Sequence, residues 1–254
     1  LLGLSPEGLH LFCHQQQGCG FCQGFLLLAQ LLLQAFDLPL LWQTLEHPSA
    51  SVSAPVVIGL LQRADRLLTG FDTITVLADR AFPSAELLGW FEGHSRWRYV
   101  MRLRSDTWIH GTAAPMGCEV SRLRLPRGHC RGFQHVQLWG DGHQRANLLL
   151  ARPAGIAAAE PWYLVSNLDP SLDLVWTYGQ RFCCEQLFRD QKSGIFQLES
   201  SGLRDPARID RLLCCSAVSR AMPSAWPVND AASIPIGSEA SALPASVCTG
   251  CSRA

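Results

Sequence analysis

The sequence predicts an α/β protein with a mixed β-sheet flanked by helices and a β-rich segment inserted before the last helix. Three features of the chain support this fold class. Residues 25–104 alternate short apolar runs, suited to strands, with helical patterns. Residues 105–177 carry Gly, Pro and Thr between short β-like runs and show no long helical period. A polar stripe with helical spacing then follows within residues 178–194.

Composition allows a folded protein, because 48% of the 254 residues are hydrophobic. The formal net charge is zero, which argues against a general nucleic-acid binder. The charge is unevenly distributed, however, since residues 1–62 contain no Lys or Arg. Residues 96–131 contain eight Arg against Asp106 and Glu119, an excess of six positive charges suited to phosphate backbones. A solvated strand face is the alternative explanation for these arginines.

Cysteine usage favours scattered, reduced thiols. The 11 cysteines include two CxxC pairs, Cys19/Cys22 and Cys248/Cys251. The halves of a compact zinc site lie much closer in sequence than these pairs do. The alternative explanation of these cysteines is a cysteine-rich metal-binding module.

The most apolar run begins at Phe25 and is interrupted by Gln30, Gln34, Asp37 and Pro39. It is too short and too polar to span a bilayer, and no basic segment precedes it as in a signal peptide. We therefore expect a cytoplasmic protein. The chain begins with Leu, which predicts a truncated copy or a mis-assigned start.

The first half of the chain contains the predicted strands and helices of a core. Residues 1–24 have no clean period and predict an irregular N-terminal remnant. Two buried strands are expected at 25–36 and 39–46. A helix should run from about 54 to 68, because Ser and Pro precede its apolar positions and Gly70 follows them.

A short strand with Ile74, Val76 and Leu77 should end at Asp79, and Pro83 should open a second helix. Alternating basic and apolar residues predict a further strand at 96–103. An Asp at the carboxyl end of a central strand is a common ligand position, although a helix cap or a turn also explains one such Asp.

Later segments differ in character. The β-rich segment contains predicted strands at 118–125, 131–139, 146–152 and 161–166. Residues 214–254 are rich in Ala, Ser and Pro and carry few charges, so we expect a low-complexity, disordered tail.

Residues 178–194, YGQRFCCEQLFRDQKSG, are the most informative stretch. On a helix with about 100° per residue, Arg181, Glu185 and Lys192 lie at about −60°, −20° and −40° from Tyr178. Four polar side chains therefore share one stripe, and Lys192 is the only lysine of the chain. A surface ion pair between Arg181 and Glu185, at i,i+4, is the structural alternative.

This Tyr-Arg-Glu-Lys spacing resembles the signature of bacterial insertion-sequence DDE transposases of the family-four type. The block VLADRAF around Asp79 and the stretch SGIFQLESSGLRDPARIDRLL after Lys192 strengthen the resemblance, which covers about Leu38 to Leu213. It implies a ribonuclease-H-like core at 25–104, a β-rich insertion at 105–177, and completion of the core at 178–213.

The resemblance also implies an activity and a site. Such transposases hydrolyse phosphodiesters and transfer strands at insertion-sequence ends, with three carboxylates binding Mg²⁺ or Mn²⁺. Asp79 matches the second carboxylate and Glu185 the third, so both are expected catalytic and metal-binding residues. Tyr178, Arg181 and Lys192 are the expected DNA-binding residues. Double-stranded DNA is the expected partner, and family analogy alone implies a homodimer.

The first carboxylate of the family has no match here. It should lie within about residues 9–22, which contain no Asp or Glu, and the first Asp of the chain is Asp37. We therefore expect impaired activity, with a catalytically dead DNA-binding remnant as the alternative. Trp108 and Trp139 are candidates for stacking on a flipped base, although core packing explains either one.

Overall fold

A computed structural model of the chain describes residues 9–17, 25–33, 38–47, 52–140, 144–154, 160–183, 189, 194, 197, 200–203, 205–225 and 251–253. The strands are β1 (Leu9–Gln17), β2 (Phe25–Leu33), β3 (Leu38–His47), β4 (Ile74–Ala78), β5 (Trp97–Arg102), β6 (Trp108–Gly111), β7 (Ala114–Glu119), β8 (His129–Leu138), β9 (Gln144–Arg152), β10 (Trp162–Ser166) and β11 (Cys251–Arg253). The described helices are α1 (Ala54–Leu67), α2 (Ala85–Glu92), α3 (Leu172–Gly179), α5 (Pro206–Ala225) and the short 3-10 helices η2 (Val120–Arg122) and η3 (Gln180–Cys183).

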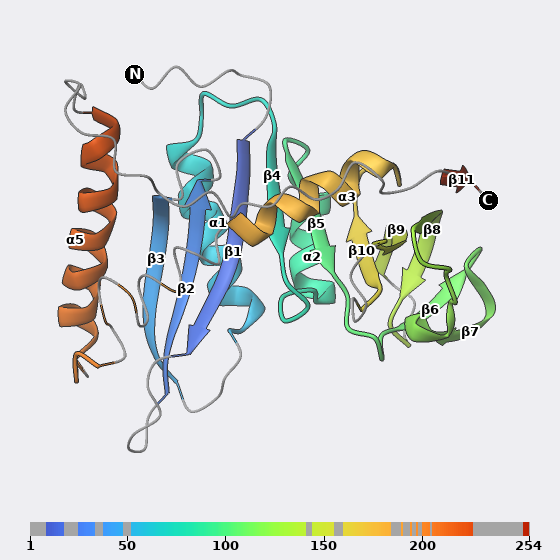
Figure 1. The fold of residues 1–254 in the computed structure, drawn as a ribbon, viewed down its shortest axis with the longest axis horizontal. Helices are drawn as coiled ribbons and strands as arrows, with labels where there is room; N and C mark the ends of the chain where they lie inside the picture. Colours follow the sequence, from blue (N-terminus) through green and yellow to red (C-terminus); the bar gives the residue numbers. More distant parts are fainter. Residues whose placement is uncertain are drawn as a thin grey trace.

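The strands form one mixed sheet in the order β3-β2-β1-β4-β5-β10-β9-β8-β6-β7, with β11 beside β8. β4 is parallel to both of its neighbours, β1 and β5, whereas β2, β3 and β10 are joined by antiparallel pairing. α3 crosses one face of the sheet, and α1 and α2 lie on the other (Figure 1). This architecture confirms the predicted α/β class.

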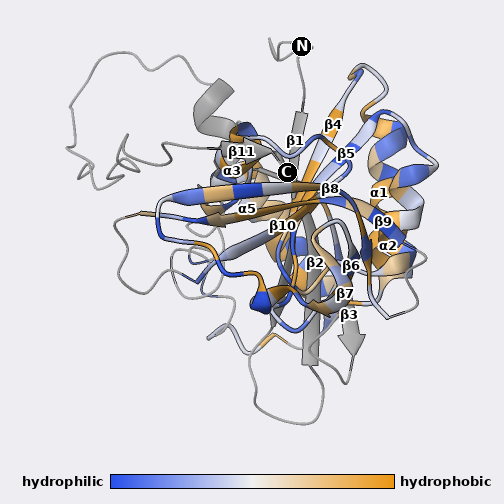
Figure 2. Cartoon of the chain, turned by 90° about the vertical axis from the view of Figure 1, so that its right-hand side faces the viewer, coloured by the Kyte–Doolittle hydropathy of each residue, from blue (hydrophilic) through white to orange (hydrophobic). Residues whose placement is uncertain are grey.

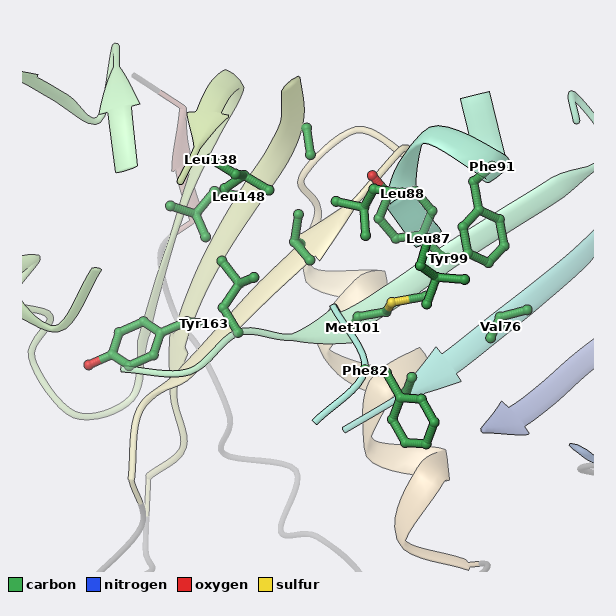
Figure 3. Packing of buried hydrophobic residues seen from close by; sticks show 14 of the residues in the cluster. Val76, Phe82, Leu87, Leu88, Phe91, Tyr99, Met101, Leu138, Leu148 and Tyr163 are labelled. Carbon is green, nitrogen blue, oxygen red and sulfur yellow. The ribbon is translucent and has the colours of Figure 1, made fainter. Parts of the chain in front are cut away.

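The core has two layers because side chains alternate between the faces of each strand. Val76 and Tyr99 face α1 and α2, whereas their neighbours Leu77 and Val100 face α3. Figure 3 shows the first layer, where the α2 side chains Leu87, Leu88 and Phe91 pack over β5. Figure 2 shows the hydrophobic residues of the central strands beside helices that carry both hydrophobic and hydrophilic residues.

β1 corrects the expectation of an irregular start, because Leu9–Gln17 is a strand. It pairs with β4 on one side and with β2 on the other. A strand bonded on both edges is held by its backbone and needs no polar alternation in its sequence. The expected pair at 25–36 and 39–46 is present as the antiparallel strands β2 and β3.

The predicted β-rich segment contains β6 to β10, and these strands continue the sheet outward from β5. One predicted strand differs, since β7 ends at Glu119 and residues 120–122 form η2. The Leu123 N–H donates to the Val120 carbonyl at 3.1 Å and closes this turn, and the buried Val120 anchors it, since its own N–H donates to the Thr107 carbonyl at 2.9 Å.

α5 crosses position 214, where the low-complexity tail was expected to begin. It runs to Ala225, and its buried Ile209 and Leu213 pack against Trp42 of β3 and Leu203. Small residues such as Ala, Ser and Cys do not prevent helix formation when an apolar contact anchors the first turns. Residues 226–250 lie outside the described part of the chain.

The end of α1 is tied to the start of β5 by one carboxylate. Asp65 Oδ1 accepts hydrogen bonds from the buried Trp97 indole Nε1, at 2.6 Å, and from Arg96 Nε, at 2.8 Å. Arg96 also donates to the carbonyls of Leu68 and Phe71, beyond the helix end. The Trp97 hydrogen bond, and then Arg96, hold the Asp65 pKa below its ordinary value, against the opposing effect of burial.

Replacing Asp65 with Ala should therefore destabilise the fold. The Trp97 indole N–H would stay buried without its acceptor, which costs about 1–3 kcal/mol of the free energy of unfolding. Urea denaturation followed by tryptophan fluorescence measures the change. Asp65→Asn is the matched control, because its amide oxygen still accepts from Trp97, and its loss should be smaller. Equal stability of Asp65→Ala and wild type would contradict the role of this tie.

The same contact predicts a pH dependence. The folded pKa of Asp65 lies below the unfolded value of 3.8, so its contribution is present above that value. The contribution is lost as pH falls through the folded pKa. The stability difference between wild type and Asp65→Asn should accordingly shrink in denaturation curves recorded below about pH 4.

Candidate active site

The candidate site lies at the carboxyl end of β4, where the buried strand Ile74–Ala78 stops and Asp79 follows. The Arg80 N–H donates to Asp79 Oδ1 at 2.7 Å, and the Phe82 N–H donates to the Asp79 carbonyl at 3.1 Å. These bonds turn the chain and orient the half-buried carboxylate. Its Oδ2 accepts no hydrogen bond from any residue that the structure describes.

Two arginines flank this carboxylate and share one partner. Glu160 Oε2 lies 2.7 Å from Arg102 Nη2 and 3.5 Å from Arg80 Nη1. Arg102 ends β5, the parallel neighbour of β4, and β10 follows Glu160 antiparallel to β5. The sheet therefore brings residues about 80 positions apart in sequence to one edge.

α3 brings Tyr178 to the same end of the sheet. The predicted helix from Tyr178 in fact begins at Leu172, after Ser171 in an extended N-cap conformation. Leu174, Val175 and Tyr178 share a helical face that packs on the sheet, which explains the earlier start. Tyr178 is fully buried and lies in the last turn of α3.

After Gly179 the chain tightens into η3, so the assumed 100° spacing does not hold across residues 180–183. In a 3-10 helix residues i and i+3 eclipse one another. Arg181 accordingly stacks near Tyr178, with its guanidinium carbon 5.7 Å from that ring and 4.9 Å from the Phe182 ring. Arg181 is only 7% exposed, so its charge is held inside an aromatic cluster.

Electrostatics connects these groups to Asp79. Burial raises the pKa of Tyr178, and the negative charge of Asp79 raises it further. The positive charges of Arg181 and Arg102 oppose the rise. Asp79, Arg102 and Arg181 therefore all lie within electrostatic reach of one buried hydroxyl. The structure thus brings together Asp79, Tyr178 and Arg181, three of the five residues that the sequence singled out.

The other two predicted residues, Glu185 and Lys192, lie outside the described residues, as does Asp37. Proximity of Asp79 and Glu185 stays a prediction. β1 is the strand on which the first carboxylate was expected, and its Cys13 pairs with Ala78. Continuing that register places His14 beside Asp79, and the strand sequence LHLFCHQQQ contains no carboxylate.

A divalent metal fits this edge only in part. Mg²⁺ prefers oxygen ligands, and the Asp79 carboxylate, oriented through Oδ1, supplies one. Within the described ranges, no group of three or more His, Cys, Asp or Glu could hold a metal ion. A complete site would thus need a ligand from elsewhere in the chain, such as Glu185. Cys118, Cys214 and Cys215 are free thiols.

The arginine-rich segment has mixed roles. Arg96 is committed to Asp65, and Arg104 pairs with Asp106 at 2.8 Å. The exposed arginines of this segment include Arg98, Arg122, Arg124 and Arg131. Sequence reasoning missed Glu160, because a single Glu after an Ala-rich stretch has no periodic signal.

The two tryptophans also differ. Trp108 on β6 is 41% exposed, while one side meets the Gly117 backbone, where an added Cβ would lie 2.8 Å from its Nε1. Trp139 is half-buried against the first core layer. Trp108 therefore keeps an open surface, and Trp139 contributes to packing. The described part of the chain contains no helix that is both long and apolar enough to cross a membrane.

The chain resembles known proteins in both sequence and fold. A family model described as a transposase DDE domain matches residues 25–221. No curated protein matches the sequence. A piggyBac transposase, solved in a synaptic complex with hairpin DNA, has a similar fold with a TM-score of 0.53 and 15% identity. The match covers 87% of this chain and 49% of the transposase, so the chain spans about half of its length.

The catalytic domain of human endonuclease V aligns with 15% identity over 88% of each chain, but its TM-score of 0.31 supports no conclusion. The fold shared with the transposase confirms the predicted ribonuclease-H-like class.

Gly132 of β8 sets the position of α3, and we expect Gly132→Ala to destabilise the fold. A Cβ there would lie 2.6 Å from Pro170 Cβ, just before the helix that carries Tyr178. Overpacking of this kind costs about 1–3 kcal/mol, measurable as a lower midpoint in thermal or urea unfolding. The control is Gly59→Ala in α1, which meets nothing within 4 Å. That control should stabilise the helix by up to about 1 kcal/mol, and a loss equal to that of Gly132→Ala would refute the steric explanation.

Proposed function

The chain belongs to the transposase DDE domain family, and from this premise we propose that it cuts and joins double-stranded DNA at the ends of an insertion sequence. The spacing of Tyr178, Arg181, Glu185 and Lys192 supports assignment to the family-four type. The observation that carries the proposal is the convergence of Asp79 with Tyr178 and Arg181, which come from segments about 100 residues apart.

The proposed reaction is phosphodiester hydrolysis followed by attack of the freed 3′-hydroxyl on target DNA. Asp79 and Glu185 would hold Mg²⁺ or Mn²⁺, which supplies Lewis-acid stabilisation of charge on the reacting oxygens. The Arg80 N–H holds the Asp79 carboxylate in one orientation. Such a fixed carboxylate loses little freedom on binding a ligand.

The DNA would be bound by the Tyr178, Arg181 and Lys192 side chains. Arg181 offers a planar fork that suits a phosphate, and its aromatic neighbours keep that fork in one orientation. Tyr178 and Arg181 are both buried, so direct contact of either with DNA would require that its cover be moved. Trp108, with its open surface, is the better placed tryptophan for stacking on a base.

We further propose that activity is impaired, because β1 lacks the first carboxylate. Continuing the β1–β4 register one residue beyond Cys13 and Ala78 would put His14 opposite Asp79, and the β1 sequence contains no acid. A catalytically dead, DNA-binding remnant is the second candidate, and the same observation favours it. A homodimer acting on two element ends, in the cytoplasm with its DNA, completes the proposal by family analogy.

A nicking assay tests this function. Purified protein, incubated with Mg²⁺ or Mn²⁺ and a duplex containing an element end, should nick one strand slowly. Asp79→Asn and Glu185→Gln should each lower the rate of nicking by at least about 100-fold. A residue that only orients a metal ligand typically costs about 10- to 100-fold when it is replaced, and loss of the ligand itself should cost more. The matched control is Asp72→Asn, which removes an exposed charge at the opposite end of β4.

Two other results would decide against the enzyme. A shift in gel mobility without any nicking would support the remnant. Nicking that both Asp79→Asn and Asp72→Asn leave unchanged would place the reaction outside this sheet edge.

A further inference from the structure

We propose that Arg80, Arg102 and Arg104 form a subsite for a DNA phosphodiester beside Asp79, and that Glu160 covers this subsite in the DNA-free chain. The inference rests on the proposed function, because it names the part of the DNA that this edge of the sheet would bind. It adds an inhibitory role for Glu160, a residue that the reaction itself does not use.

A shallow hollow of about 390 Å³ lies next to the Asp79 turn and is lined by Arg80, Ala81, Arg104, Ser105 and Asp106. Two guanidinium groups and one hydroxyl can all donate hydrogen bonds, and a phosphate group offers only acceptors. The size and the donors of the pocket therefore suit one phosphodiester group.

Carboxylates of the chain already hold these arginines. Arg104 bonds both oxygens of Asp106, at 3.1 and 2.8 Å, which is the paired geometry that arginine offers to phosphate. Glu160 bonds Arg102 and lies close to Arg80. Each arginine therefore faces an anion of the chain itself where a DNA phosphate would be expected.

A DNA phosphate could replace the Glu160 carboxylate beside Arg102. The Glu160 side chain is 67% exposed, whereas that of Arg102 is 16% exposed. The Glu160 carboxylate is mostly solvated, so it can leave the pair and be hydrated by water. Arg102 is anchored in β5 and would stay in place to receive the incoming phosphate. DNA binding also gains from counterion release, which the internal carboxylate does not provide.

Removing the Glu160 charge should thus strengthen DNA binding. With a fluorescent 20-base-pair duplex and no divalent metal, we expect Glu160→Gln to bind about three- to tenfold more tightly than wild type at moderate salt. The slope of log K against log salt should steepen by about 0.9, the value for one additional phosphate contact. Arg80→Gln and Arg104→Gln should each weaken binding and flatten the slope.

Matched controls separate this subsite from a general effect of charge. Asp72→Asn adds the same net charge at the opposite end of β4, and Arg98→Gln removes an exposed arginine near the start of β5. Neither control should change affinity by more than about twofold. Thermal melting of each variant verifies that folding is unchanged.

Each outcome is decisive. If Glu160→Gln behaves like Asp72→Asn while wild type binds the duplex, the subsite is wrong and the proposed DNA-binding function stands. If neither wild type nor Glu160→Gln binds any duplex, both proposals fail. Binding by Glu160→Gln alone would establish Glu160 as the inhibitory group.

Discussion

The parallel pairing of β4 with both β1 and β5 is the constraint on which the rest of the molecule depends. All five residues of β4 are buried, so the strand is covered on both faces and bonded on both edges. Since the side chains of such a strand are buried, the first side chain that can reach a ligand belongs to the residue just after its carboxyl end. That residue is Asp79. The neighbouring strand β5 ends at Arg102, and both residues therefore meet at the same edge.

Strand alternation then determines which helix reaches this edge. Leu77 and Val100 point away from α1 and α2 and create a separate apolar surface. α3 covers it, and covering it requires Tyr178 to face inward. The burial of Tyr178 and the stacking of Arg181 beside it thus follow from core packing, before any contact with a ligand is considered. The Arg181 side chain therefore packs against Tyr178 and also places a positive charge in the neighbourhood of Asp79.

Much of this fold could be predicted from sequence because its signals are local. The apolar spacing of α1, the short run before Asp79 and the alternation in β5 each lie within one element. β1 could not be predicted, since backbone pairing on both sides holds it whatever its side-chain pattern. The start of α3 differs from the prediction because its apolar face lies before Tyr178, whereas the polar stripe that predicted the helix begins at Tyr178. Asp79 and Arg181 both act on the buried Tyr178 from segments far apart in the sequence, and only family resemblance indicated that they would share a site.

The number of arginines in a segment does not tell how many of them are free to bind a ligand in the folded chain. The six excess positive charges at 96–131 include arginines that the fold already occupies, such as Arg96 with Asp65 and Arg104 with Asp106. Fold and chemistry can also separate at β1, whose place in the sheet depends on backbone pairing with β2 and β4. A carboxylate on β1 is not needed for any of these backbone bonds. The fold therefore agrees with the family of the chain whether or not that acid is present, and activity must be judged from the acids at the edge of the sheet.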